Sequence, residues 1–192
     1  MKTYKLLPIG LLMALLTGCA FTPQEANLDP TISVMPSQEG QGVTVSVNVV
    51  DERPSKSLGH RGSGYGKGAE ITATQDLDVV VYDKVTAALR TKGFTVADAG
   101  VESPVSLKIE VRLLEYTTSV GFWTGGVHVN GALKAIADNN GEIYERMYRS
   151  DDEERVVFVP DATSNEKMIN ESLSFLLNQV IGDNALIGHL AK

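Results

Sequence analysis

The sequence is poor in cysteine, in basic residues and in long apolar runs, and each shortage argues against a class of protein. Cys19 is the only cysteine, so no internal disulfide bond can form. The 17 Lys and Arg residues are outnumbered by 24 Asp and Glu residues and form no basic cluster, which argues against nucleic acid as a partner. The same shortage argues against a polybasic surface that would hold anionic lipid.

One apolar run, Leu6–Leu16, follows Lys2 and Lys5 near the N-terminus and is broken only by Pro8 and Gly10. The run is too short to span a bilayer stably, because a spanning helix takes about 20 residues. It has the length of the apolar core of a secretory signal peptide. We therefore expect the chain to be exported and this segment to be removed.

The segment ends in Leu16-Thr17-Gly18-Cys19, which resembles the lipobox of bacterial lipoproteins. The resemblance implies cleavage between Gly18 and Cys19, a diacylglyceryl group on the Cys19 sulfur and acylation of the new amino group. Two or more acyl chains hold a protein stably on a membrane, whereas one chain binds only marginally. The alternative is that Cys19 is an ordinary thiol near a secretory cleavage site.

Ala20 follows the cysteine, and lipoproteins of this kind with aspartate there tend to stay at the inner membrane. The resemblance therefore implies an outer-membrane protein that faces the periplasm. We divide the chain into a signal peptide (1–18), a lipidated N-terminus and extended tether (19–41), and a single α+β periplasmic domain (42–192). Prolines among polar residues predict the tether, in which Thr31–Met35 is a candidate short strand.

Alternating apolar residues predict the strands of the domain. The alternation runs over Val43–Val49 and is clearest over Val105–Leu113, and we expect further strands at Val127–Ala137 and Glu142–Ser150. Asp138–Gly141 contains Asn-Gly, which tolerates positive φ and predicts a hairpin turn between the last two strands.

Apolar residues at helical spacing predict two amphipathic helices. The first is expected over Asp76–Lys92, and the second from about Ser164, where Thr163 and Glu166 have the spacing of a capping box. The apolar stripe of the first helix is Leu77, Val81, Val85 and Leu89, with Ala88, and that of the second is Ile169, Leu173, Leu176 and Val180. Leu186–Ala191 is a candidate extension of the second helix. We expect an α+β fold in which a mixed, mainly antiparallel sheet carries the two amphipathic helices on one face.

This layout resembles the YajG family of uncharacterised bacterial lipoproteins. The matching features are the Leu-Thr-Gly-Cys anchor, the strands "GVTVSVNVVDERP" and "PVSLKIEVRLLEY", the helix "DLDVVVYDKVTAALRTKGFTV" and the C-terminal helix. The resemblance covers nearly the whole chain, and its motifs are structural. It implies the localisation and the extent of the domain, but it brings no activity, cofactor or catalytic residue.

The stretch "GHRGSGYGKG", residues 59–68, has a P-loop lysine without the rest of the motif. A P-loop needs G-x-x-x-x-G-K-[ST] directly before a helix, but Arg61 replaces the first glycine and Gly68 the hydroxyl residue. We therefore expect no nucleotide. One reading is a mobile surface loop. The other is a loop that becomes ordered on a partner, with Arg61, Tyr65 and Lys67 as the contacts.

Phe122 and Trp123 lie among glycines between two predicted strands. Aromatic side chains in partly exposed turns are favoured at interfaces, so this turn is a second candidate interface, with protein or with lipid headgroups. The alternative is that both rings fold back over the core or the tether.

No local motif indicates catalysis or a metal. Asp151–Glu154 lacks the alternating ligands and the glycine of a calcium loop, so we expect it to be a solvated strand end. His60, His128 and His189 have no metal-ligand spacing. No G-x-S-x-G elbow is present, although a triad assembled from distant residues stays open. We expect no catalytic residue, no metal and no cofactor.

These observations favour a non-catalytic binding or accessory lipoprotein of the cell envelope. Its partners would be the membrane, through the lipid on Cys19, and an envelope protein or ligand that the sequence does not identify. One alternative is an envelope enzyme or enzyme activator acting on peptidoglycan or glycolipid. Another is a structural subunit of an envelope assembly.

The lipobox makes a direct prediction about the mature N-terminus. Mass spectrometry of the protein isolated from its host should find Cys19 as the first residue, carrying a diacylglyceryl group and an acylated amino group. An uncleaved signal segment, or an unmodified Cys19, would overturn both the anchor and the localisation.

Overall fold

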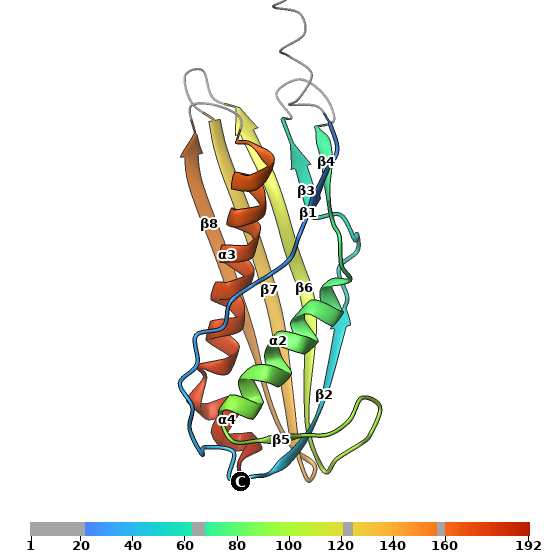
Figure 1. The fold of residues 1–192 in the computed structure, drawn as a ribbon, viewed down its shortest axis with the longest axis vertical. Helices are drawn as coiled ribbons and strands as arrows, with labels where there is room; N and C mark the ends of the chain where they lie inside the picture. Colours follow the sequence, from blue (N-terminus) through green and yellow to red (C-terminus); the bar gives the residue numbers. More distant parts are fainter. Residues whose placement is uncertain (1–21, 63–67, 121–124, 157–159) are drawn as a thin grey trace, which may run out of the picture.

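The structure, a computed structural model, describes residues 22–62, 68–120, 125–156 and 160–192. These residues form one curled mixed sheet with helices on one face (Figure 1). The elements in chain order are β1 (Gln24–Ala26), β2 (Thr44–Asp51), β3 (Gly59–Arg61), β4 (Ala69–Ala73), α2 (Leu77–Thr91), β5 (Thr95–Val96), β6 (Val105–Val120), β7 (Gly125–Asn139), β8 (Glu142–Val156), α3 (Ala162–Ile181) and α4 (Asn184–Leu190).

β6 is the central strand, and its two edges have different neighbours. Along one edge, β2 pairs in parallel with residues 106–111 and β3 pairs in parallel at Tyr116. Along the other edge, β7 pairs antiparallel over the whole of β6, and β8 then pairs antiparallel with β7. β4 and β1 extend the sheet beyond β3, and β5 extends it beyond β2.

The prediction of a mainly antiparallel sheet is wrong, because four of the seven strand pairings among the described residues are parallel. Alternating residues show which face of a strand is buried, but not the direction of its neighbour. The parallel pair β2–β6 arises because α2 carries the chain back along the sheet, as parallel strands require. The hairpin predicted at Asp138–Gly141 is confirmed: it joins β7 to β8, with positive φ at Asn140 and Gly141.

The described residues contain three helices rather than two. Leu186–Ala191 does not prolong α3; it belongs mostly to α4, which begins after Gly182 and Asp183. The Asp183 side chain accepts hydrogen bonds from the backbone N–H groups of Ala185 and Leu186, so it caps a new helix.

The start of α3 also differs from the predicted capping box. The N-cap is Asp161, whose carboxylate accepts a hydrogen bond from the Ser164 backbone N–H at 2.8 Å. Aspartate is one of the favoured residues at this position, so Thr163 is not needed as the cap.

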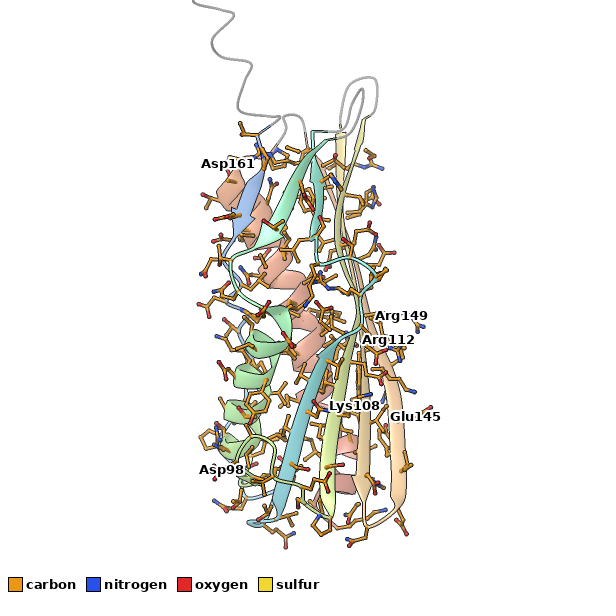
Figure 2. All side chains as sticks on the ribbon, turned by 90° about the vertical axis from the view of Figure 1, so that its right-hand side faces the viewer. Asp98, Lys108, Arg112, Glu145, Arg149 and Asp161 are labelled. Atoms are coloured by element: carbon orange, nitrogen blue, oxygen red, sulfur yellow. The ribbon has the colours of Figure 1, made fainter. Side chains whose placement is uncertain are left out.

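The helices cover one face of the sheet and bury the predicted apolar stripes. On α3, the stripe Ile169, Leu173, Leu176 and Val180 is buried, and on α2 the same holds for Leu77, Val81, Val85 and Leu89. Figure 2, turned by 90°, shows both helices on one side of the sheet and the labelled Arg112, Glu145 and Arg149 on the other.

A register shift in β6 changes which of its residues face the helices. The pairing with β7 slips between Val111 and Leu113. The predicted alternation put Leu113 on the buried face, but Leu113 is only half-buried, and Leu114 and Tyr116 are buried instead. A bulge inserts one residue and so moves the later residues to the opposite face.

Gly59 makes the junction between β3 and β6 possible. Its φ is +123°, and a Cβ at this position would lie 1.8 Å from the Tyr116 carbonyl oxygen. We expect Gly59→Ala to lower the free energy of unfolding by about 3 kcal/mol or more, because it adds a backbone collision to an unfavourable φ. Chemical denaturation measures this change.

Gly100→Ala is the matched control. Gly100 also has a positive φ, +81°, but a Cβ there would meet no atom within 4 Å. Its substitution should lower the free energy of unfolding by about 1 kcal/mol. Equal effects at the two positions would contradict the close approach of β3 to β6.

Candidate functional site

The N-terminal segment lies against the domain. β1 pairs with β4, and residues 27–33, which we call the strap, then run along α3 (Figure 1). Alternate strap residues donate backbone N–H hydrogen bonds of 2.7–2.9 Å to α3 side chains four positions apart: Asn27 to Glu166, Asp29 to Asn170, Thr31 to Ser174 and Ser33 to Asn178. The two repeats match because two extended residues advance about 6.6 Å and four helical residues about 6 Å.

Backbone carbonyls of the strap also accept hydrogen bonds from α3 side chains. The Asn170 side-chain amide donates to the Asn27 carbonyl and the Asn178 amide donates to the Thr31 carbonyl, each at 2.9 Å. The candidate strand at Thr31–Met35 is therefore not formed, because its backbone bonds to helix side chains instead of to a strand. The described part of the predicted tether lies on the domain rather than apart from it.

The segment remains attached after the strap. The backbone N–H groups of Ser37, Gly40 and Gly42 donate to carbonyls at the C-terminal end of α2 and just beyond it. A Cβ at Gly40 would lie 2.5 Å from the Phe94 ring, so this approach requires glycine.

A buried polar network joins β1, β3, β6 and α3 at the end of the domain where β1 begins. Gln24 Oε1 accepts from Arg61 Nη1 at 3.3 Å and from Asn165 Nδ2 at 2.9 Å. The Tyr116 hydroxyl donates to Asn165 Oδ1 at 2.6 Å. Burial raises the pKa of Tyr116 to about 12, so the phenol stays a neutral donor.

Arg61, a candidate contact of the glycine-rich loop, belongs to this network. It ends β3, pairs with Ala69 of β4, and is only 8% exposed. The sequence predicted an exposed loop, because neither the β3–β4 hairpin nor the β1 strand that covers it has a recognisable pattern. The other candidate contacts, Tyr65 and Lys67, lie outside the described residues.

The remaining predicted site residues also lie outside the described part of the chain. They are Gly18 and Cys19, in the segment 1–21, and Phe122 and Trp123, in the segment 121–124. The described residues that flank the aromatic turn, Val120 and Gly125, pair with each other at the ends of β6 and β7.

A groove of about 310 Å3 opens between α3 and two paired strand segments, residues 127–129 of β7 and residues 152–154 of β8. Val127 and Val129 of β7 form its floor, and Phe175, which is 54% exposed, stands on the helix side. The complete lining is Val127, Val129, Asp152, Glu153, Glu154, Met168, Glu171 and Phe175.

Four carboxylates rim this groove. Asp152 pairs with Val129 and Glu154 with Val127, so both side chains are on the face of the sheet that carries the helices. Within the described residues, Asp152, Glu153 and Glu154 make no ion pair, and Glu171 makes one with Lys167, at 3.6 Å. The sequence reading of Asp151–Glu154 as a solvated strand end missed the two carboxylates on the inner face.

A cluster of side chains around the Asp183 carboxylate has a structural role. Asp183 Oδ2 accepts from the hydroxyls of Tyr144 and Tyr148 and from Arg146 Nη1, at 3.1, 2.7 and 3.0 Å. Burial acts to raise the pKa of Asp183, but the hydrogen bonds from the two tyrosines and from the backbone N–H groups of Ala185 and Leu186 outweigh it, and the pKa is lowered. The cluster fastens β8 to the junction of α3 and α4.

The outer face of the sheet carries a network of ion pairs. Glu110 pairs with Lys108 and Arg112, and Glu52 pairs with the same two cations. The hydrogen bond from Lys108 is the main cause of the lowered pKa of Glu110. Within this network the two carboxylates are balanced by the two cations.

Among the described residues, no three His, Cys, Asp or Glu side chains are grouped as metal ligands would be. None of the helices in the described ranges is long and apolar enough to cross a membrane.

A curled mixed sheet, covered on one face by helices and by its own N-terminal segment, defines a class of α+β domain known from solved bacterial proteins. Protein XCC0632 from Xanthomonas campestris is similar with a TM-score of 0.63 at 14% identity, over 86% of this chain and 95% of that one. A putative neuraminyllactose-binding hemagglutinin homolog from Helicobacter pylori is similar with a TM-score of 0.50 at 11% identity, over 85% and 97%. At these identities the likeness shows the fold alone.

The family is shown by the sequence. A family model described as "uncharacterized lipoprotein" matches residues 30–191. The chain therefore belongs to this lipoprotein family, which is the YajG family that it resembles. No curated protein matches the sequence.

The strap makes a prediction about local stability. The double substitution Asn170→Ala and Asn178→Ala removes four hydrogen bonds between α3 and the strap, two accepted and two donated by the asparagine side chains. Each such bond contributes about 0.5–1 kcal/mol of stability at an exposed site. We expect hydrogen exchange of the strap amides to become several-fold faster, as measured by mass spectrometry.

Lys167→Ala is the control, because it alters the same helix but removes only the exposed ion pair with Glu171. It should leave exchange in the strap unchanged. Unchanged exchange in the double variant would show that the α3 side chains do not hold the strap.

Proposed function

We propose that this protein is a lipid-anchored lipoprotein of the outer membrane that faces the periplasm and acts as a non-catalytic binding protein. Membership of a lipoprotein family and the lipobox ending in Cys19 support the anchor. The groove beside α3 supports binding, because it offers the exposed ring of Phe175 and charged groups at its rim.

The attachment of the N-terminal segment is the observation that carries the proposal. Only the four residues 20–23 separate Cys19 from Gln24, the first residue of β1. A chain of this length reaches about 17 Å when fully extended. A lipid on Cys19 would therefore hold the β1 end of the domain against the membrane surface.

The register of the sheet relates the groove to this end. Gln24 pairs with Ile71, and the same transverse row continues through Gly59, Tyr116, Val129 and Asp152. Val129 and Asp152 line the groove. Five strand spacings of about 4.8 Å make up this row, so the groove lies at the same end of the sheet as Gln24.

Two variants test the anchor and the membrane separately. The intact protein should fractionate with the outer membrane on a density gradient. Cys19→Ser removes the acylated sulfur, so this variant should leave the outer membrane fraction. Ala20→Asp keeps the lipid but adds the residue linked to inner-membrane retention, so it should move the protein to the inner membrane.

Two results of the fractionation would contradict the proposal. If the intact protein is found with the inner membrane, the outer-membrane assignment is wrong. If Cys19→Ser remains with the outer membrane, the lipid on Cys19 is not what holds the protein there.

A further inference from the structure

We propose that the groove between α3 and β8 binds a basic amphipathic segment of a partner protein. This inference rests on the proposed function, since it names the partner of a binding protein. Apolar side chains of the segment would pack against Phe175 and Met168, and Lys or Arg side chains would face the rim.

The apolar part of the groove is left open by the fold. Phe175 projects from α3 beside a fully buried stripe, yet 54% of its surface is exposed. It is the one aromatic residue among the large apolar side chains exposed in the described ranges. Half-buried Met168 lines the groove beside it, above Val127 and Val129, which are only 1% and 2% exposed. Aromatic side chains such as Phe175 dominate binding energy when a partner covers them.

The charges of the rim decide the chemistry of the partner. Asp152, Glu153 and Glu154 have no cation within ion-pair distance among the described residues, and Lys167 reaches only Glu171. Covering the groove would remove water from these carboxylates, and buried charges without partners are strongly unfavourable. A neutral or acidic segment would meet this penalty, whereas Lys and Arg side chains would supply the missing charge.

The groove also lies where a partner can reach it. β8 is the last strand on its side of the sheet and pairs only with β7, so its outer edge has no neighbour in the described structure. Charged residues on the inner face of such a strand discourage the addition of a plain apolar strand. The same carboxylates would repel anionic lipid headgroups, so the surface is suited to a basic segment of a protein rather than to the membrane.

A defined peptide pair tests the proposal with the full-length lipidated protein in a nonionic detergent. The probe is an 18-residue amphipathic helix of Leu and Lys, and its partner carries Glu in place of every Lys. Fluorescence anisotropy should show that the Leu/Lys peptide binds and that the Leu/Glu peptide does not. Binding should weaken as the salt concentration rises, because salt screens charge pairs.

Two variants should remove the binding, and two matched controls should not. Phe175→Ser should weaken the affinity about tenfold or more, as expected for an aromatic anchor. The double variant Asp152→Lys and Glu154→Lys should abolish binding. Val79→Ser changes an apolar side chain of α2 that is 53% exposed, and Glu115→Lys reverses an exposed charge on the opposite face of the sheet. Both controls should bind as the intact protein does.

Several outcomes would overturn the proposal. Equal binding of the two peptides would mean that the carboxylates do not select the partner. Equal weakening by Val79→Ser or Glu115→Lys would mean that the site is not this groove, and no binding of the Leu/Lys peptide at all would reject it. The measurement takes place in detergent, so its result is independent of the fractionation that tests the outer-membrane anchor.

Discussion

Hydrogen bonding along both edges of β6 is the constraint on which the structure depends. This strand has 16 residues, and no single short strand could satisfy one of its edges. β2 and β3 share that edge, while the β7–β8 hairpin fills the other. The shared edge requires Gly59, where a side chain would strike the Tyr116 backbone. The other edge makes β8 the last strand, and therefore creates the groove beside α3.

Much of the fold could be predicted, because the buried apolar residues recur along the sequence at the spacing of a strand or of a helix. The strand at Val43–Val49, the hairpin around Asn140 and the buried stripe of α3 were all readable in this way. The bulge in β6 was not, because Leu113 and Leu114 are both apolar and fit either register. Parallel pairing was also hidden, since alternation carries no information about the direction of a neighbouring strand.

The candidate site was less predictable, because its residues look like ordinary surface. Glu166, Asn170, Ser174 and Asn178 have the polar character of a solvated helix face, but they bind the strap. The acidic run at Asp151–Glu154 looks like a solvated strand end until its pairing with β7 is known. Cys19, Gly18, Phe122, Trp123, Tyr65 and Lys67 lie outside the described residues and stay predictions.

The parallel pairing of β1 with β4 would have a mechanical consequence in the proposed lipid-anchored protein. A pull on the chain at Gln24 that is directed along the axis of β1 would not open the pair from one end. All hydrogen bonds of the pair are then loaded together in shear, instead of breaking one after another as in the opening of a zipper. The Gln24 amide, bonded to the Ala162 carbonyl at 2.8 Å, passes part of that load to the first turn of α3.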